Sequence, residues 1–340
     1  MILIVKKLGM FLLAGTVAFL LLCLFSAVYY NPSSHLPSPT GATDYIREPN
    51  RRYAYMSEGF SFGRVDSGGF NNPGRMAENC SSPDILFMGS SHMEAMYVPP
   101  DCSAPYLLNE MLRPEGKTVY SIAISSNPLL RCLKNLNRAL EYYHPQEYVV
   151  IETMYVTFTI KEMENLLTGR MSRNASYSKD DWRYWIQQPP YVKLIYSQYS
   201  NVLNNVDNET QNEDSYVQAA RDDWRYKELI GEVMIMLKSI SSEHNVEPVL
   251  LFHPRLAIQA DGSVDTAFNR DDFALLKQAC SEYGVIFLDL TDAFMNGYTE
   301  GNILPHGFAN TEIGAGHINR NGHRIAAESL YDMIKQREAV

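Results

Sequence analysis

Short apolar runs alternate with longer amphipathic stretches along most of this chain. Five runs have the length and apolar content of buried strands: 84–88, 118–124, 147–153, 247–252 and 284–289. Five stretches with apolar residues at helical spacing follow them: 104–113, 128–143, 216–242, 270–282 and 321–336. Strands that alternate with helices predict an α/β domain, in which a central parallel sheet is covered by helices on both faces.

The N-terminus carries a longer apolar segment. Lys6 and Lys7 precede an uncharged stretch from Leu8 to about Tyr29, close to the roughly 20 residues that span a bilayer as a helix. No Lys or Arg follows before Arg47, so the positive-inside rule places the N-terminus in the cytoplasm and the rest outside. A cleaved signal peptide is the alternative, but the segment is long for one and no clear small-x-small site follows it. We therefore expect a single-pass membrane protein with an extracytoplasmic domain.

The pattern divides the chain into an anchor, a linker and one folded domain. Residues 1–30 form the cytoplasmic stub and the anchor, and residues 31–50, which are rich in Pro and Ser, are expected to be a linker. Residues 51–340 then form the α/β domain, interrupted at 157–215 by an insertion rich in Trp and Tyr. This insertion has two interpretations: a cap that shapes a substrate groove, or a satellite hydrophobic cluster.

Composition narrows the range of partners. The chain is 46% hydrophobic and 20% charged, which is ordinary for a globular domain, and its net charge of −10 argues against nucleic acid as a partner. Cys80 and Cys102 flank the strand at 84–88, and an exported context permits a disulfide between them; free thiols are the alternative. We find no zinc-type spacing and no glycine-rich phosphate loop, so we expect no metal and no cofactor.

A serine follows the first predicted strand. The apolar run ends in Gly89-Ser90-Ser91-His92, a tight turn at the start of a helix. Binding sites of parallel sheets lie at the C-terminal ends of the strands. A hydroxyl held there, beside the free amides of a helix N-terminus, suits an acyl-transfer nucleophile. The alternative is that Ser91 only caps the helix.

A histidine lies in a glycine-rich loop just before the last predicted helix. His317 follows Gly314 and Gly316, and imidazole is the side chain best suited to accept a proton from a hydroxyl near neutral pH. Its place after the last strand makes it the candidate partner of Ser91. We expect the remaining histidines to be ordinary polar side chains at the surface: His92, His253, His306 and His323. Two alternatives are that His253, which lies with Arg255 at a strand end, lines the site, and that His323 caps or packs in the last helix.

These two stretches together resemble the SGNH (GDSL-type) hydrolase family. Gly89-Ser90-Ser91 stands where the family has Gly-Asp-Ser, and the segment from His317 to His323 matches its last block, His-x-Asn-x-x-Gly-His. The approach at 285–294 also looks like the family, and the resemblance covers about 84–335 without the insertion. It implies a flavodoxin-like three-layer sandwich.

The resemblance also implies roles for individual residues. Ser91 is then the nucleophile and His317 the general base. The amide of Ser91 is one oxyanion donor, and Ala123 supplies another because it stands where the family has a glycine. Gly89 belongs to the same binding set, and Asn127 is a candidate side-chain donor.

Besides Ser90 and Ala123, two further family positions differ here. The aspartate three residues before the histidine is Gly314, so the third catalytic group is expected to be Glu312 or a backbone carbonyl. The asparagine of the third family block is replaced in the region of Glu152 and Thr153.

We therefore expect an extracytoplasmic serine esterase or O-acyltransferase. By analogy with the family, its substrate is a small acyl donor or an acylated glycan of the cell envelope. Two alternatives stay open: a lipase-like or thioesterase enzyme, and a catalytically weak domain that binds a glycan or assembles an envelope complex. The sequence leaves the oligomeric state open.

Overall fold

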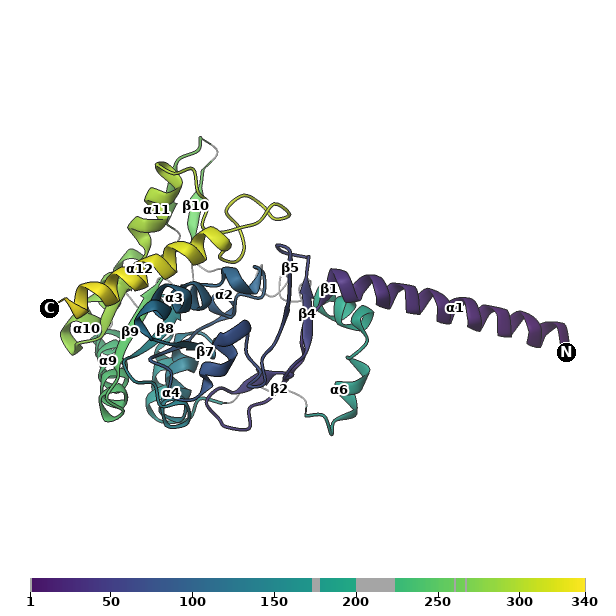
Figure 1. The fold of residues 1–340 in the computed structure, drawn as a ribbon, viewed down its shortest axis with the longest axis horizontal. Coiled ribbons are helices and arrows are strands. Elements are labelled where there is room, and N and C mark those ends of the chain that lie inside the picture. The colour runs from purple at the N-terminus through teal and green to yellow at the C-terminus, as the bar shows by residue number, and fades with distance from the viewer. Residues whose placement is uncertain (1, 173–177, 200–223, 260, 267, 340) are drawn as a thin grey trace.

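The computed structural model describes residues 2–172, 178–199, 224–259, 261–266 and 268–339, and contains a central parallel sheet (Figure 1). The strands of this sheet are β6 (Ile85–Met88), β7 (Val119–Ser121), β8 (Tyr148–Thr153), β9 (Glu247–Phe252) and β12 (Ile286–Asp289). They are ordered β12-β9-β8-β6-β7, which is the flavodoxin-like order when the strands are counted along the chain. The predicted α/β class is confirmed.

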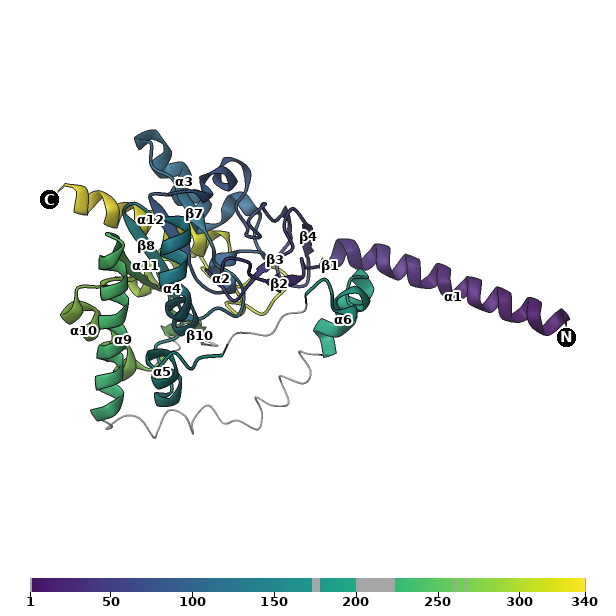
Figure 2. The ribbon, with the colours of Figure 1, turned by 90° about the horizontal axis from the view of Figure 1, so that it is seen from below.

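Helices cover both faces of this sheet (Figure 2). One face carries α4 (Leu129–Tyr143), α5 (Ile160–Leu167), α9 (Trp224–Glu243) and α10 (Arg270–Tyr283). The other face carries α3 (Ala104–Leu112), α11 (Thr291–Thr299) and α12 (Arg320–Glu338). Successive strand residues alternate between the two cores: Leu86 and Met88 lie in the first, and Ile85 and Phe87 in the second. Because both faces are buried, each strand reads as a continuous apolar run.

The expected elements agree with the observed ones except at some ends. The strand at 118–124 is shorter, because β7 ends at Ser121 and the chain then turns away. The helix expected at 216–242 begins, within the described residues, at Trp224, and its first residues lie outside them.

Smaller elements complete the domain. A hairpin formed by β10 (Leu256–Ile258) and β11 (Val264–Thr266) follows β9. Short 3-10 helices occupy Gly74–Cys80, Pro100–Cys102 and Arg113–Glu115. Cys80 and Cys102 are free thiols, so the disulfide alternative is not the one observed.

The N-terminal helix extends away from the rest of the molecule (Figure 1). Helix α1 (Ile2–Tyr29) contains a stretch, Ile4–Tyr29, long and apolar enough to cross a membrane by length and composition. The segment expected to be the anchor is therefore a single continuous helix.

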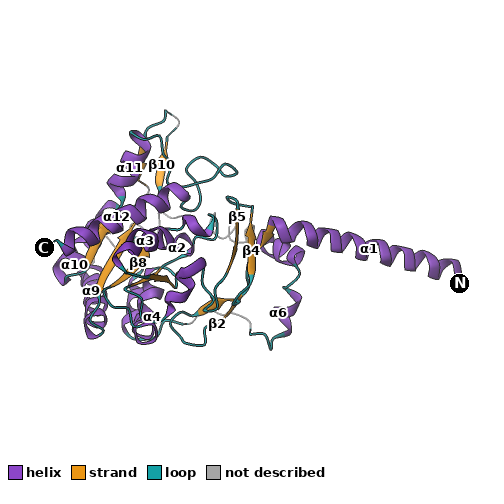
Figure 3. Ribbon diagram, in the orientation of Figure 1, coloured by secondary structure: helices purple, strands orange, loops and turns teal. Residues whose placement is uncertain are grey.

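Residues 31–50 are part of the folded domain and not a linker, which corrects the expectation. The segment forms β1 (Tyr30–Asn31), β2 (His35–Pro37) and β3 (Tyr45–Arg47), and antiparallel pairs join β1 to β4 (Arg52–Tyr55) and β4 to β5 (Ser61–Arg64) (Figure 3). This Pro- and Ser-rich segment also contains two buried charged side chains, those of Asp44 and Arg47.

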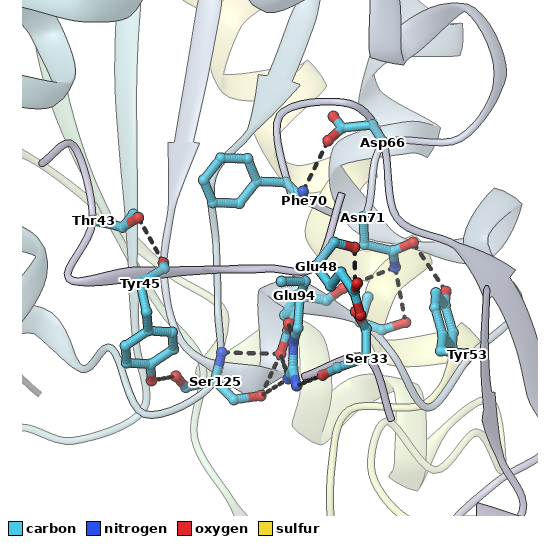
Figure 4. A network of polar contacts seen from close by, with 12 residues as sticks. Ser33, Thr43, Tyr45, Glu48, Tyr53, Asp66, Phe70, Asn71, Glu94 and Ser125 are labelled. Carbon is cyan, nitrogen blue, oxygen red and sulfur yellow. Dashed lines mark hydrogen bonds and ion pairs between the residues drawn. The ribbon is translucent and has the colours of Figure 1, made fainter. Parts of the chain in front are cut away.

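Arg47 ties this N-terminal region to the α/β core. Its Nε and Nη2 donate to the two oxygens of Glu94 at 2.6 and 2.9 Å. Glu94 also accepts from the backbone amide of Ser125 at 2.9 Å (Figure 4). A buried pair held by several hydrogen bonds is costly to break from one side, so the N-terminal strands are fixed against the loop after β7.

The aromatic insertion is described in part. Its helices are α5, α6 (Trp182–Ile186) and a helical stretch at 190–199. Residues 173–177 and 200–215 of the expected insertion lie outside the described residues. Helix α6 lies beside the C-terminal end of α1, away from the sheet (Figures 1 and 2).

Candidate active site

Ser91 is the first residue of the short helix α2 (Ser91–Glu94), directly after the turn that ends β6. The cap of this helix is Ser90, whose side chain accepts from the amide of His92. The capping role considered for Ser91 therefore belongs to its neighbour. The amide of Ser91 stands at the helix start, where backbone N–H groups have no carbonyl partner within the helix.

Ser91, His317 and Glu58 form a chain of hydrogen bonds. The hydroxyl of Ser91 lies 2.9 Å from His317 Nε2, and His317 Nδ1 lies 2.9 Å from Glu58 Oε2. Glu58 Oε1 also accepts from the backbone amide of His317 at 2.5 Å. A carboxylate on Nδ1 keeps the ring proton there, which leaves Nε2 free to accept the serine proton.

The third group of this chain is Glu58 and not Glu312. Glu312 is exposed, and the carboxylate bonded to His317 comes from the loop between β4 and β5. Gly314, which stands in the family's aspartate position, is part of the loop that brings His317 to Glu58. Sequence reasoning missed Glu58 because it lies 259 residues before the histidine, in a segment that the family resemblance does not reach.

Glu58 is held closely by its surroundings. A Cβ placed on Gly316, whose φ is +98°, would come within 2.3 Å of Glu58 Oε1, so only glycine permits this approach. Asn310 ties the Glu58 loop to the histidine loop: its Oδ1 accepts from the Gly59 amide at 2.9 Å, and its Nδ2 donates to the Met56 carbonyl at 2.8 Å. Burial raises the pKa of Glu58, but the hydrogen bonds and charge of His317 outweigh it and leave that pKa below its ordinary value.

Tyr97 covers one face of the histidine. Its ring stacks on that of His317, with centroids 4.0 Å apart and planes 23° apart. The same tyrosine lines a cleft of about 440 Å³, together with Arg47, Ser125 and Lys193. Burial, with the positive charge of Arg51, lowers the pKa of Lys193 to about 8. The cleft next to the histidine therefore has both aromatic and basic lining groups.

The expected oxyanion donors are engaged elsewhere, with the exception of the Ser91 amide. The amide of Ala123 donates to Ser121 Oγ at 3.3 Å, and the side-chain amide of Asn127 donates to Cys132 Sγ at 3.2 Å. The oxyanion roles of Ala123 and Asn127 therefore stay predictions, and each donor would have to exchange its present partner to bind an oxyanion.

Gly89 makes room for a buried carboxylate. A Cβ on Gly89 would lie 2.7 Å from Glu152 Oε2, so its small size permits this close approach; the binding role expected of Gly89 stays a prediction. Glu152 Oε2 accepts from the amide and the hydroxyl of Ser90, at 2.7 and 2.9 Å, and Glu152 Oε1 pairs with His253 Nε2 at 2.8 Å. Glu152, in the region where the family has its asparagine, therefore holds the turn that carries Ser91.

The histidines expected at the surface are buried beside this site. His92, His253 and His306 are 7%, 0% and 1% exposed, and one ring nitrogen of each lies within 4.8 Å of the others. His323 is also buried, and its Nδ1 accepts from the amide of Ala104 at 3.2 Å. Within the described residues, the group of three is the one cluster of side chains suited to hold a metal ion; the large sequence separations hid it from any spacing rule.

Comparison with known proteins gives the following results. No family model matches the sequence, and no curated protein does. Solved structures with a similar fold include an esterase from Pseudoalteromonas sp., with 14% identity, a TM-score of 0.40, and coverage of 75% of this chain and 98% of that one. An acetyl xylan esterase has 12% identity, a TM-score of 0.38 and coverage of 74% and 98%. A putative SGNH hydrolase from Slackia heliotrinireducens has 12% identity, a TM-score of 0.38 and coverage of 75% and 100%.

The fold follows from this chain's own topology. Along the chain, Ser91 follows β6, the first strand of the parallel sheet, and His317 precedes the last helix, α12. These are the positions that the sequence resemblance assigned to the two residues. The protein therefore has a three-layer α/β fold with a flavodoxin-like strand order, which is the fold that the resemblance to the SGNH-type hydrolases predicted.

Proposed function

We propose that this protein is a serine hydrolase of acyl esters, with Ser91 as nucleophile, His317 as general base and Glu58 as orienting acid. The observation that carries the proposal is the continuous hydrogen-bond chain from Ser91 Oγ through His317 to Glu58. A nucleophile within hydrogen-bond reach of a base, which a third group orients in turn, is the arrangement that activates a serine.

The reaction proceeds through an acyl-enzyme. Ser91 Oγ attacks the ester carbonyl while His317 Nε2 takes the hydroxyl proton, and the imidazolium is stabilised by Glu58. The amide of Ser91 donates to the tetrahedral oxyanion, and one such donor is worth about 2.7–4 kcal/mol of barrier in measured cases. The imidazolium then gives its proton to the leaving alcohol. Water, activated by His317 in the same way, releases the acyl group; if a sugar hydroxyl takes its place, the enzyme is an O-acyltransferase.

We further propose that the domain is extracytoplasmic and acts on ester groups of cell-envelope carbohydrate. Helix α1, with Lys6 and Lys7 at its start, supports an anchor with the N-terminus inside. Similar solved structures include an acetyl xylan esterase and an esterase active on acetylated mannans, which makes acetylated glycans the first substrates to assay. The aromatic lining of the cleft beside Tyr97 suits a sugar ring.

The test is fluorophosphonate labelling of the full-length protein in detergent, followed by intact-mass measurement. We expect one adduct on the wild type, none on Ser91→Ala, strongly slowed labelling on His317→Ala, and wild-type labelling on Glu312→Gln. Labelling that persists in Ser91→Ala, or none on folded wild type, would overturn the proposal and favour a binding module. Release of acetate from acetylated xylan, compared with acetyl transfer to added oligosaccharide, then separates hydrolase from transferase.

A further inference from the structure

Three histidines from distant parts of the chain converge beneath Ser91. His92 follows the serine in α2, His253 follows β9, and His306 lies in the loop that pairs with Ile318. The ring centroids of His92 and His253 are 4.8 Å apart, and His306 lies 5.8 Å from His253 and 6.1 Å from His92. Such a group of imidazoles has no role in the acyl-transfer chemistry proposed above.

Several nitrogens of this group are buried without hydrogen bonds. His253 Nδ1 and both ring nitrogens of His306 have no partner in the described part of the chain. Buried polar atoms without partners are rare, and each points to a missing water or ion. In a neutral imidazole one ring nitrogen carries no proton and can offer its lone pair to a metal ion.

Glu152 fixes the tautomer of His253 so that its Nδ1 lone pair is free. Its Oε1 accepts from His253 Nε2 at 2.8 Å, which keeps the ring proton on that atom and leaves Nδ1 unprotonated. A carboxylate on the far nitrogen of a histidine is the usual support of a metal-ligating imidazole. His92 is not oriented for a metal ion in the same way, because its Nδ1 accepts a long hydrogen bond from the Ile318 amide (3.2 Å). To bind the ion, His92 has to give up this hydrogen bond at Nδ1 or lose the proton on its other ring nitrogen.

We propose that His92, His253 and His306 bind a divalent transition-metal ion, Zn²⁺ in the first place. A set of imidazoles without thiolate or carboxylate ligands suits Zn²⁺ and does not suit the hard cations Mg²⁺ and Ca²⁺. The ion crosslinks the serine turn, the end of β9 and the loop before α12. It therefore acts as a positioning element for Ser91, and it does not enter the acyl-transfer steps.

The test measures metal directly on the full-length protein in detergent, carrying an affinity tag without histidine. After chelator treatment, addition of excess Zn²⁺ and dialysis of the unbound ion, we expect about one equivalent of Zn²⁺ by mass spectrometry of the metal. We expect this to be lost in His306→Ala and His253→Ala and retained in His323→Ala, a control that removes another fully buried histidine. Retention in Ser91→Ala separates this proposal from the fate of the hydrolase proposal.

A second readout does not depend on variants. Co²⁺ bound by three imidazoles in tetrahedral geometry gives visible d–d absorption, which we expect on titration of the wild type and which Zn²⁺ should abolish. Absence of this band together with no bound Zn²⁺ overturns the proposal, and the orphaned nitrogens then hold water. Equal Zn²⁺ binding by the wild type and His306→Ala also overturns it, because the ion then lies elsewhere.

A different observation carries a second inference, about the surface beside α1. In the segment 182–199, six large apolar or aromatic side chains are more than half exposed: Trp182, Trp185, Ile186, Ile195, Tyr196 and Tyr199. An exposed group of this size marks an interaction surface. Figure 1 shows α6 running across the direction of α1, beside its C-terminal end.

This segment is fixed to the anchor and to the chain that leaves it. Tyr191 packs edge-on against Phe19 of α1, with centroids 6.3 Å apart. Lys193 Nζ donates to the Pro32 carbonyl at 2.9 Å, and Gln188 Nε2 donates to Ser34 Oγ at 3.1 Å. Phe19 lies ten residues inside the end of α1, or about 15 Å along the helix axis. A segment in contact with α1 at that depth reaches the membrane wherever α1 spans it.

We infer that the segment 182–199 lies in the outer interface of the lipid bilayer as a second membrane contact. Trp and Tyr are enriched at this level because each has an apolar ring and a polar tip. The occupant of the surface is then lipid, and the catalytic domain is held close to the bilayer and does not hang from a free tether.

The three tryptophans of the chain supply the test. In Trp224→Phe, the remaining emission comes from Trp182 and Trp185; in the double variant Trp182→Phe/Trp185→Phe it comes from Trp224, which starts α9 on the side of the sheet away from α1 (Figure 2). We expect brominated phosphatidylcholine in proteoliposomes to quench the first protein strongly and the second little. Equal weak quenching in both, in protein that floats with the vesicles, overturns the inference. Protein that does not float refutes the anchor as well.

Discussion

Replacing Glu58 by glutamine tests the assignment of the third catalytic group most directly. The carboxylate accepts two hydrogen bonds from His317, one from the backbone amide and one from Nδ1. Glutamine has one oxygen and one NH₂ for these two donors. If the oxygen keeps the amide, the NH₂ faces Nδ1, makes it an acceptor and moves the ring proton to Nε2. The ring then cannot accept the proton of Ser91.

The expected loss of kcat in Glu58→Gln can be estimated from a known change of the same kind. Giving the histidine the wrong tautomer in a serine protease lowers kcat by about 10⁴. The side chain of Glu58 is 20% exposed, and water weakens the contact, so we expect a loss of about 10³ in kcat, or roughly 4 kcal/mol in activation free energy. Glu58→Ala should lose less, because a free ring samples both tautomers. KM should change little, since Glu58 orients the base and does not touch the substrate.

The assay is hydrolysis of p-nitrophenyl acetate by the full-length protein, with the rate of fluorophosphonate labelling as a second readout. Because the pKa of Glu58 lies below its ordinary value, its carboxylate stays ionised at pH 5, so protonation of Glu58 should not lower the wild-type rate between pH 7 and pH 5. Glu312→Gln is the matched control and should retain wild-type kcat. The reasoning is refuted if Glu58→Gln retains kcat within about threefold of the wild type, or if Glu312→Gln loses as much.

Three further substitutions test residues that surround the hydrogen-bonded residues Ser91, His317 and Glu58. Gly316→Ala should abolish activity, because its Cβ would meet the orienting carboxylate at 2.3 Å; Gly262→Ala has the same left-handed strain in open space, so a thermal melt should show similar destabilisation but full activity. Glu152→Ala removes the acceptor of three donors, the amide and hydroxyl of Ser90 and His253 Nε2, so urea unfolding should show a loss of about 1–3 kcal/mol for each donor that stays unpaired. Tyr97→Leu removes the ring stacked on the histidine and should lower kcat by about three- to tenfold, while Tyr97→Phe should not; a full rate in the leucine variant would contradict the stacking role.

The α/β architecture was predictable because each buried strand and each amphipathic helix leaves a local periodic pattern. Ser91 and His317 were predictable for a related reason: a strand-end turn and a loop before the last helix are positions that local sequence defines. The apolar segment that ends near Tyr29 likewise identified α1 as a candidate membrane span.

Long-range packing decided the rest. Nothing near Glu58 in the sequence reveals that the hairpin between β4 and β5 folds back onto the histidine loop. The same applies to Arg47, whose buried pair with Glu94 turns an apparent linker into structure. The sequence by itself determined the central sheet with helices on both faces. It also identified Ser91, at the end of a strand, and His317, just before the last helix. Only the tertiary structure places Glu58 beside His317 and brings His92, His253 and His306 together. These contacts join segments that are far apart in the sequence, and no local pattern connects them.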